Sequence, residues 1–399
     1  MSALGERMRE VVVPDAEAAE ERSWRVTRAA FAEREAAEPA ARQRSARTRW
    51  TVPRARLAAA AVALIALVAL ALTPPGRAVA GWVRDAIRPD RSPPARVPAR
   101  PVLASLPGGG RLLVLSPGGP WIVRADGSRR LLGPYDDATW SPHGLFVAAT
   151  RGDALVAIAP DGRVRWSLGR PRVSAPRWSP SGYRIAYRSG RELRVVAGDG
   201  TGDRLLARAA GPAAAAWRPA TPGHVLAWPG RGGRVVVGDV DTRRTLGRSG
   251  SGEPPRRLDW SADGRRLLAV GAHGWRLLDA RGRLLRSRRL PPGTTAGAAA
   301  FAPRGHAFAL VRESAGAADV VLLPRERLVF RGAGRLGDLA WSPDGRWLAI
   351  GWPSADQWLF VRAAPARRVV AIDRVARQFD PGRPRARAAP RIAGWCCAR

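Results

Sequence analysis

The 399-residue sequence contains no lysine, only two cysteines and only two methionines. All 67 basic residues are therefore arginines, and they outnumber the 33 acidic residues to give a formal net charge of +34. A charge of this size is typical of proteins that bind nucleic acid or anionic membranes. The arginines are spread over most of the chain, so we interpret them as a compositional bias and predict no nucleic-acid-binding surface. The positive charge would still attract the protein to anionic polymers and lipid head groups.

The two cysteines, Cys396 and Cys397, are adjacent. This spacing excludes a loop-closing disulfide and a structural zinc site within one chain. Three states stay open: unpaired thiols, a vicinal disulfide, or a link to another chain. The last four residues resemble a prenylation box, but arginine at the final position does not suit that modification.

Glycine and proline, by contrast, are abundant, with 43 and 35 residues. This favours many short strands joined by turns over long helices. A hydrophobic fraction of 46% argues against a chain that is disordered throughout. The length suits one large domain or two of ordinary size.

Residues Leu57–Leu72 form an uninterrupted apolar run that ends at Thr73-Pro74-Pro75. Sixteen residues are slightly fewer than a membrane span usually has, and a buried core helix is the alternative. No polar face marks the run, so we predict one transmembrane helix within residues 55–75. Six arginines crowd the N-terminal flank and four follow the run, which places the N-terminus in the cytoplasm and the remainder outside.

A cleaved signal sequence is the competing interpretation, because Ala78-Val79-Ala80 fits a cleavage site. Its leader would exceed fifty residues, far more than such peptides have. Either way, the chain beyond this point is expected to be exported. Residues 76–101 are rich in proline and arginine, and we expect a semi-extended linker next to the membrane.

The segment before the apolar run, residues 1–54, is charged and rich in alanine. It contains one amphipathic pattern, from about Glu17 to Glu35, that would place Trp24 and Phe31 on one helix face. An isolated helix of this length is marginally stable in water. We predict a largely disordered cytoplasmic arm in which Trp24 and Phe31 are the candidates for contact with a cytoplasmic partner.

An aromatic residue followed by a turn sequence recurs along the rest of the chain. The fullest copies are Trp260-Ser-Ala-Asp-Gly and Trp341-Ser-Pro-Asp-Gly, and the spacings between successive copies are 38, 39, 43, 41 and 40 residues. A period near forty is typical of one four-stranded propeller blade. The aromatic positions are Trp140, Trp178, Trp217, Trp260, Phe301 and Trp341.

The turn chemistry supports a hairpin in each repeat. Serine can bond its own backbone, proline fixes φ, and glycine tolerates the exit conformation of a type I turn. Many of the following strands are apolar on both faces, as expected where sheets pack on both sides. We interpret the six aromatics as packing residues between blades and predict no catalytic, cofactor-binding or metal-binding residue among them.

The strands add up to six complete blades and a first blade of three. Propellers commonly close by borrowing a strand from the opposite terminus, because an open sheet edge is a liability. Residues Pro390–Trp395 offer such a strand. We therefore predict an all-β, seven-bladed β-propeller over residues 102–395, closed by the C-terminal tail; six blades with an irregular start are the alternative.

These Trp-Ser-Pro-Asp-Gly repeats resemble the propeller repeats of the TolB type, a WD40-like family of bacterial exported proteins. The resemblance covers about Val102 to Ile372. It implies a protein-binding platform outside the inner membrane of a bacterium. Two features depart from the family: a predicted membrane helix replaces the TolB N-terminal domain, and the repeats at Trp217 and Phe301 are degraded.

A search for catalytic residues yields none. The four histidines, His143, His224, His273 and His306, fall in different repeats and should be dispersed around the ring. Gly108-Gly109-Gly110 lacks the lysine and helix of a phosphate loop. Peptidases with similar propellers carry a separate hydrolase domain with a G-x-S-x-G elbow, which we do not expect in a chain filled by repeats.

The sequence thus favours a membrane-anchored scaffold that binds a protein or cell-envelope glycan, with no cofactor. The alternative is a propeller enzyme, a hydrolase or lyase, with its site in the central channel. Converging carboxylates or histidines in the channel would favour catalysis, whereas arginines and aromatics would favour binding.

Overall fold

The computed structural model describes residues 99–100, 103–208, 210–220, 222–362, 368–380 and 389–397. The predicted arm with Trp24 and Phe31, the apolar run 57–72 and most of the linker lie outside these ranges. Within them, no helix has the length and apolar character needed to cross a bilayer.

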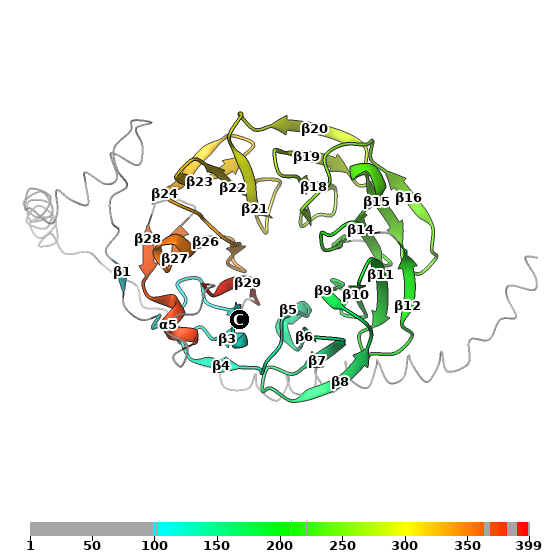
Figure 1. Cartoon of the computed structure of the whole chain (residues 1–399), viewed down its shortest axis with the longest axis horizontal. Coiled ribbons are helices and arrows are strands. Elements are labelled where there is room, and N and C mark those ends of the chain that lie inside the picture. The colour runs from blue at the N-terminus through cyan, green and yellow to red at the C-terminus, as the bar shows by residue number, and fades with distance from the viewer. Residues whose placement is uncertain are drawn as a thin grey trace, which may run out of the picture. The chain divides into compact units, whose positions relative to one another are not determined.

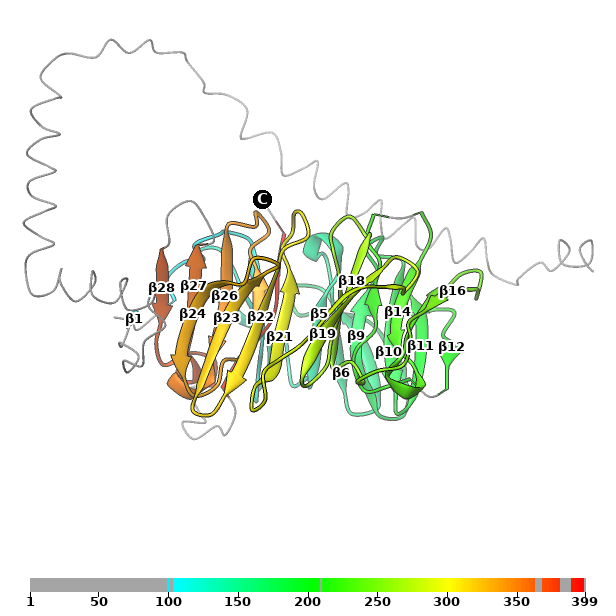
Figure 2. The same cartoon turned by 90° about the horizontal axis from the view of Figure 1, so that it is seen from above.

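Seven sheets are arranged in a ring (Figure 1). Each contains four antiparallel strands, and one of them has a short parallel fifth strand. We call the region enclosed by the innermost strands of the sheets the channel. Seen from the side, the strands run along the axis of this ring (Figure 2). The prediction of seven four-stranded blades is confirmed, and the alternative of six is wrong. In every blade the strands are neighbours in chain order from the channel outward, except that the first blade takes its innermost strand from the C-terminus.

The strands of the first four blades, from the channel outward, are as follows. Blade 1 contains β29 (Arg391–Cys396), β2 (Arg111–Ser116), β3 (Gly119–Val123) and β4 (Arg129–Leu131). Blade 2 contains β5 (Asp137–Trp140), β6 (Val147–Arg151), β7 (Ala154–Ile158) and β8 (Val164–Gly169). Blade 3 contains β9 (Val173–Trp178), β10 (Arg184–Ser189), β11 (Glu192–Ala197) and β12 (Arg204–Ala207). Blade 4 contains β13 (Ala216–Trp217), β14 (Val225–Pro229), β15 (Val235–Asp239) and β16 (Thr245–Arg248).

The remaining three blades follow the same order. Blade 5 contains β17 (Arg257–Trp260), β18 (Arg266–Val270), β19 (Gly274–Asp279) and β20 (Leu284–Arg289). Blade 6 contains β21 (Thr295–Phe301), β22 (Phe308–Ser314), β23 (Ala317–Leu323) and β24 (Arg327–Ala333). Blade 7 contains β25 (Leu339–Trp341), β26 (Trp347–Trp352), β27 (Gln357–Arg362) and β28 (Val369–Ile372), and β1 (Ala99–Arg100) adds to β28 in parallel.

Ring closure depends on the pairing of β29 with β2. The register places Arg111 opposite Cys396 and Leu112 opposite Trp395, with one irregularity between Leu113 and Val114. Cys396 ends the closing strand and forms a disulfide with Cys397. The tail thus supplies the strand that the first blade lacks.

A short helix, α5 (Val375–Phe379), packs across the seam between the last blade and the first. The Phe379 ring lies 5.8 Å from the ring of Trp121 in blade 1 and 5.0 Å from that of Trp358 in blade 7. The Asp380 carboxylate accepts hydrogen bonds from the Gly118 N–H and the Ser116 hydroxyl, each at 3.1 Å. These contacts hold together blades that lie at opposite ends of the repeat sequence.

The hydrophobic core is divided among the interfaces between blades. All six residues of β26 are buried, because sheets pack against both faces of this strand. Three of the motif aromatics, Trp217, Trp260 and Trp341, add hydrogen bonds between blades, whereas the buried indole N–H groups of Trp140 and Trp178 have no partner among the described residues. The indole N–H of Trp217 donates to the Arg177 carbonyl (2.8 Å) and that of Trp260 to the Ala216 carbonyl (3.0 Å), each on the innermost strand of the preceding blade.

The turn after the aromatic has the hydrogen bonds that its sequence requires. In blade 5, the Ser261 hydroxyl accepts the Arg266 N–H at 3.0 Å and donates to the Asp263 carboxylate at 2.6 Å. Gly264 has φ +65°, and a Cβ there would lie 2.3 Å from the Pro219 carbonyl oxygen of the preceding blade. Glycine therefore serves both the turn and the close approach of two blades.

Candidate functional site

Six charged side chains converge at the centre of the ring. They come from the innermost strands of blades 1, 2, 3, 5 and 7 or the residue just before such a strand. Arg177 of blade 3 interacts electrostatically with charges of blades 1, 2 and 5, and Asp338 of blade 7 with charges of blades 1 and 5. Charges on blades that are not neighbours come close enough to interact only near the central axis of the ring. The six are Asp137, Arg177, Arg257, Asp259, Asp338 and Arg391.

Their positions in the repeat explain why they meet. Asp137, Arg257 and Asp338 each stand three residues before a motif tryptophan. Arg177 and Asp259 stand one residue before it, which is the same face of a strand because side chains alternate.

Blades 4 and 6 have alanine where the other blades have charge. The residues at the two positions are Ala214, Ala216, Ala298 and Ala300. These two blades therefore add no charge at these positions.

Two of the channel carboxylates, those of Asp259 and Asp338, are poorly solvated. Burial raises the pKa of Asp259 to about 6, although the Phe301 N–H donates to its Oδ2 at 2.8 Å and Arg257 lies nearby. Burial likewise raises the pKa of Asp338, against the opposing effect of Arg391 and Arg257. Partial protonation of Asp259 near pH 6 therefore lowers the negative charge beside the three arginines.

The channel guanidiniums keep unused hydrogen-bond donors. Arg177 donates to the Pro176 carbonyl at 2.7 Å, and burial lowers its pKa. Arg257 Nη2 lies 4.0 Å from Asp338 Oδ1, which is too far for a hydrogen bond. Within the described ranges, no hydrogen bond joins Arg177, Arg257 or Arg391 to a carboxylate. Since each guanidinium has five N–H donors, the channel can hold an anionic group such as a carboxylate or sulfate.

The four histidines lie apart, in turns or at strand ends of blades 2, 4, 5 and 6. His273 Nδ1 is 3.1 Å from Glu253 and His306 Nε2 is 2.8 Å from Asp263. In the part of the chain that the structure describes, no group of three or more His, Cys, Asp or Glu could hold a metal ion.

Ser181, His224 and Asp241 form a relay that the sequence did not reveal. Ser181 Oγ lies 2.8 Å from His224 Nε2, and His224 Nδ1 lies 2.5 Å from Asp241 Oδ2. The connectivity is that of a nucleophile, base and acid. However, Ser181 occupies the same motif position as Asp263, which bonds His306 in the corresponding contact between blades 5 and 6. We therefore interpret both contacts as links between blades.

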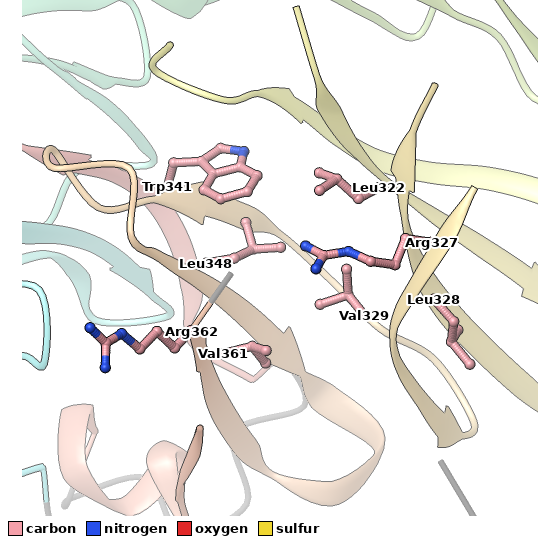
Figure 3. Close-up of a pocket in the computed structure, with 8 residues that line it drawn as sticks. All are labelled: Leu322, Arg327, Leu328, Val329, Trp341, Leu348, Val361 and Arg362. Atoms are coloured by element: carbon pink, nitrogen blue, oxygen red, sulfur yellow. The ribbon is translucent and has the colours of Figure 1, made fainter. Parts of the chain in front are cut away.

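A narrow cleft with room for about one water molecule, about 10 Å³, lies between blades 6 and 7 (Figure 3). Leu322, Val329 and Leu348 line it, and the Arg327 side chain extends across it toward Trp341. The enclosed space is far smaller than a ligand pocket, which has a volume of about 300–1,000 Å³, and the lining is that of an interface between blades.

Sequence reasoning missed the charged channel residues. An alignment of the repeats on their motif aromatics could have revealed these residues. In that alignment, alanine or another small residue occupies most of the positions one and three residues before the aromatic. A charge at such a position stands out against the alanines.

No protein-family model matches the chain, and no curated protein matches it. Solved structures do match in fold. A hydrazine synthase of Kuenenia stuttgartiensis is 15% identical over 56% of this chain and 75% of its own, with a TM-score of 0.49. A chain of the mitotic checkpoint complex is 19% identical over 60% and 81%, with a TM-score of 0.48. The C-terminal WD40 domain of Sif2 is 14% identical over 65% and 79%, with a TM-score of 0.49. At these values, none of the three bears on function. The chain's own seven four-stranded blades give it a WD40-like β-propeller fold.

The raised pKa of Asp259 predicts a pH effect on stability. An unfolded aspartate titrates near about 3.9, so between about pH 4 and 6 the folded protein binds more protons than the unfolded chain. Stability therefore falls as pH rises through this window. Asp259→Asn keeps an acceptor for the Phe301 N–H but cannot ionise. We expect its melting temperature at pH 7.5 to equal or exceed that of the wild type, and to fall less between pH 4 and 6.

Thermal unfolding followed by circular dichroism across this pH range measures the effect. Asp161→Asn is the matched control, because the pKa of the exposed Asp161 lies below its usual range, chiefly through its hydrogen bonds with Arg163. The same dependence on pH in wild type and Asp259→Asn would contradict the prediction.

Proposed function

We propose that this chain is a membrane-tethered binding platform, with its propeller outside the cytoplasm of a bacterial cell. The ligand is a protein or cell-envelope glycan that places an anionic group in the central channel. The observation that carries the proposal is the convergence of Arg177, Arg257 and Arg391, none hydrogen-bonded to a carboxylate within the described residues.

The fold suits recognition by a rigid surface. Each channel side chain stands on a strand, or on the residue just before one, in a blade that is packed between two others, so little conformational freedom is lost when a ligand binds. Arginine also matches the planar geometry of a carboxylate better than lysine does. Acidic side chains and uronic acids both present that group.

The tether is supported by the sequence. The apolar run 57–72 and its arginine-rich N-terminal flank favour a single membrane pass with the N-terminus in the cytoplasm. The resemblance to TolB-type repeats favours an exported location. The arm around Trp24 and Phe31 could then contact a cytoplasmic regulator, and loss of such a partner on deletion of residues 1–54 would support that role.

The second candidate is an enzyme with its site in the channel. One observation favours it: Asp259, with a pKa of about 6, could exchange a proton near neutral pH. The three arginines near Asp259 are better explained by binding of an anionic ligand than by catalysis. We therefore rank the enzyme second.

The tether predicts a simple fractionation result. After a high-salt wash, which removes proteins held by charge alone, deletion of residues 57–72 should move the protein from the membrane pellet to the soluble fraction, because the longest apolar run is then missing. Added protease should digest the propeller of the intact chain in spheroplasts while the N-terminal arm is protected. A deletion variant that still pellets after a high-salt wash would contradict the predicted anchor.

The channel predicts which substitutions abolish binding. The full chain is solubilised in detergent, immobilised and exposed to cell-envelope extract, and it should retain a ligand. The amount of ligand retained should be at least tenfold lower for the double variant Arg177→Gln, Arg391→Gln. The matched control is Arg191→Gln with Arg304→Gln, which removes the same charge from exposed turns.

Three outcomes decide the matter. Equal retention by all three proteins would exclude the channel as the site, and no retention by the wild type would contradict the platform. Release of a chemically altered ligand, lost in Asp259→Asn, would favour the enzyme instead.

A further inference from the structure

The outer strands of blades 4 and 5 form the most exposed part of the described sheets. Both strands, β16 and β20, lie on the outside of the ring (Figure 1). All six residues of β20 are exposed, which is true of no other described strand of four or more residues. We call the outer face of these two strands and the turns that precede them the β16–β20 surface.

The surface is continuous across the two blades. A Cβ on Gly247 of β16 would lie 1.8 Å from the carbonyl oxygen of Arg281, in the turn before β20. A Cβ on Gly282 in the same turn would lie 3.3 Å from the carbonyl carbon of Arg248. The end of β16 therefore packs directly against the turn between β19 and β20.

Exposed leucines are concentrated on this surface. Leu246, Leu284 and Leu285 are exposed by 41%, 58% and 53%, and they are three of the seven large apolar side chains exposed on the described propeller. Single exposed leucines need no explanation, but two consecutive ones on an outer strand, with a third on the outer strand of the adjacent blade, are unusual.

The same surface carries unpaired positive charge. Arg283 pairs with Asp279, and Arg288 with Glu326. Six more exposed arginines have no acidic partner within 4.0 Å among the described residues: Arg243, Arg244, Arg248, Arg281, Arg286 and Arg289.

We propose that the β16–β20 surface docks on an anionic phospholipid bilayer. Arginines bind the lipid phosphates, and the leucines enter the boundary between head groups and acyl chains. A polyanion without an apolar region would use the arginines and leave the leucines in water, whereas a bilayer surface uses both. The proposal goes beyond the binding platform and does not require the channel to bind anything.

The test places a fluorophore on the surface of the full-length chain. Ser287 of β20 is exposed, and Ser287→Cys can be labelled with nitrobenzoxadiazole because Cys396 and Cys397 are paired with each other. Ser128→Cys is the matched control, since Ser128 is exposed in blade 1 on the other side of the ring. Each protein is reconstituted in bilayers of phosphatidylcholine alone or mixed with phosphatidylglycerol.

We expect the emission of the label at position 287 to shift to shorter wavelength, and to be quenched by brominated lipids, only with phosphatidylglycerol. The label at position 128 should not respond. Leu284→Ser with Leu285→Ser, and Arg286→Gln with Arg289→Gln, should each abolish the response, whereas Arg191→Gln with Arg304→Gln should retain it. About 1 M salt, at which the Debye length is ~3 Å, should weaken it.

Three results would overturn the proposal. The first is no response at position 287 in anionic bilayers. The second is a response that survives the leucine substitutions, because net charge alone would then explain the attraction. The third is an equal response to soluble polyglutamate without lipid, which would indicate an acidic protein partner.

Discussion

The whole structure depends on one constraint: a sheet of about forty residues cannot bury both of its faces by itself. Each blade must be covered by two neighbours, and only a closed ring gives every blade two. The pairing of β29 with β2 provides that closure, and α5 reinforces it through Phe379 and the Asp380 carboxylate. The seven interface cores all follow from this single connection between the ends of the repeat sequence.

Closure also creates the channel and its chemistry. Arg391 enters the channel only because the tail supplies the innermost strand of blade 1, and there it meets charges carried by the repeats. The aromatic that defines each repeat packs between blades, while the charged residues one and three positions before it meet near the axis. The residues that hold the ring together and those that give it a binding site thus alternate on the same short strands.

Much of the fold could be predicted from the sequence, because the turn in each repeat is encoded by the residues that directly follow the aromatic. Trp260-Ser-Ala-Asp-Gly specifies the hydrogen bonds seen at Ser261 and Asp263, and the period of about forty gives the blade. The position of the missing strand followed from counting. Local patterns could not show which blades face one another across the channel, so the coupling of Arg177 with Arg391 and Asp259 was missed. The relay between Ser181, His224 and Asp241 was missed for the same reason, since its members are 43 and 17 residues apart.

The most direct test of this account removes the closing strand. A chain truncated after Ala389 loses the buried side chains of Ile392 and Trp395. Loss of large core side chains lowers the free energy of unfolding by about 2–5 kcal/mol each, and the total for a domain is only about 5–15 kcal/mol. Hydrogen exchange measured by mass spectrometry should then show β2 and the seam around α5 unprotected, and a synthetic peptide of residues 389–399 should restore protection. A truncated chain with the same protection as the intact protein would show that closure by the tail is not what holds the ring together.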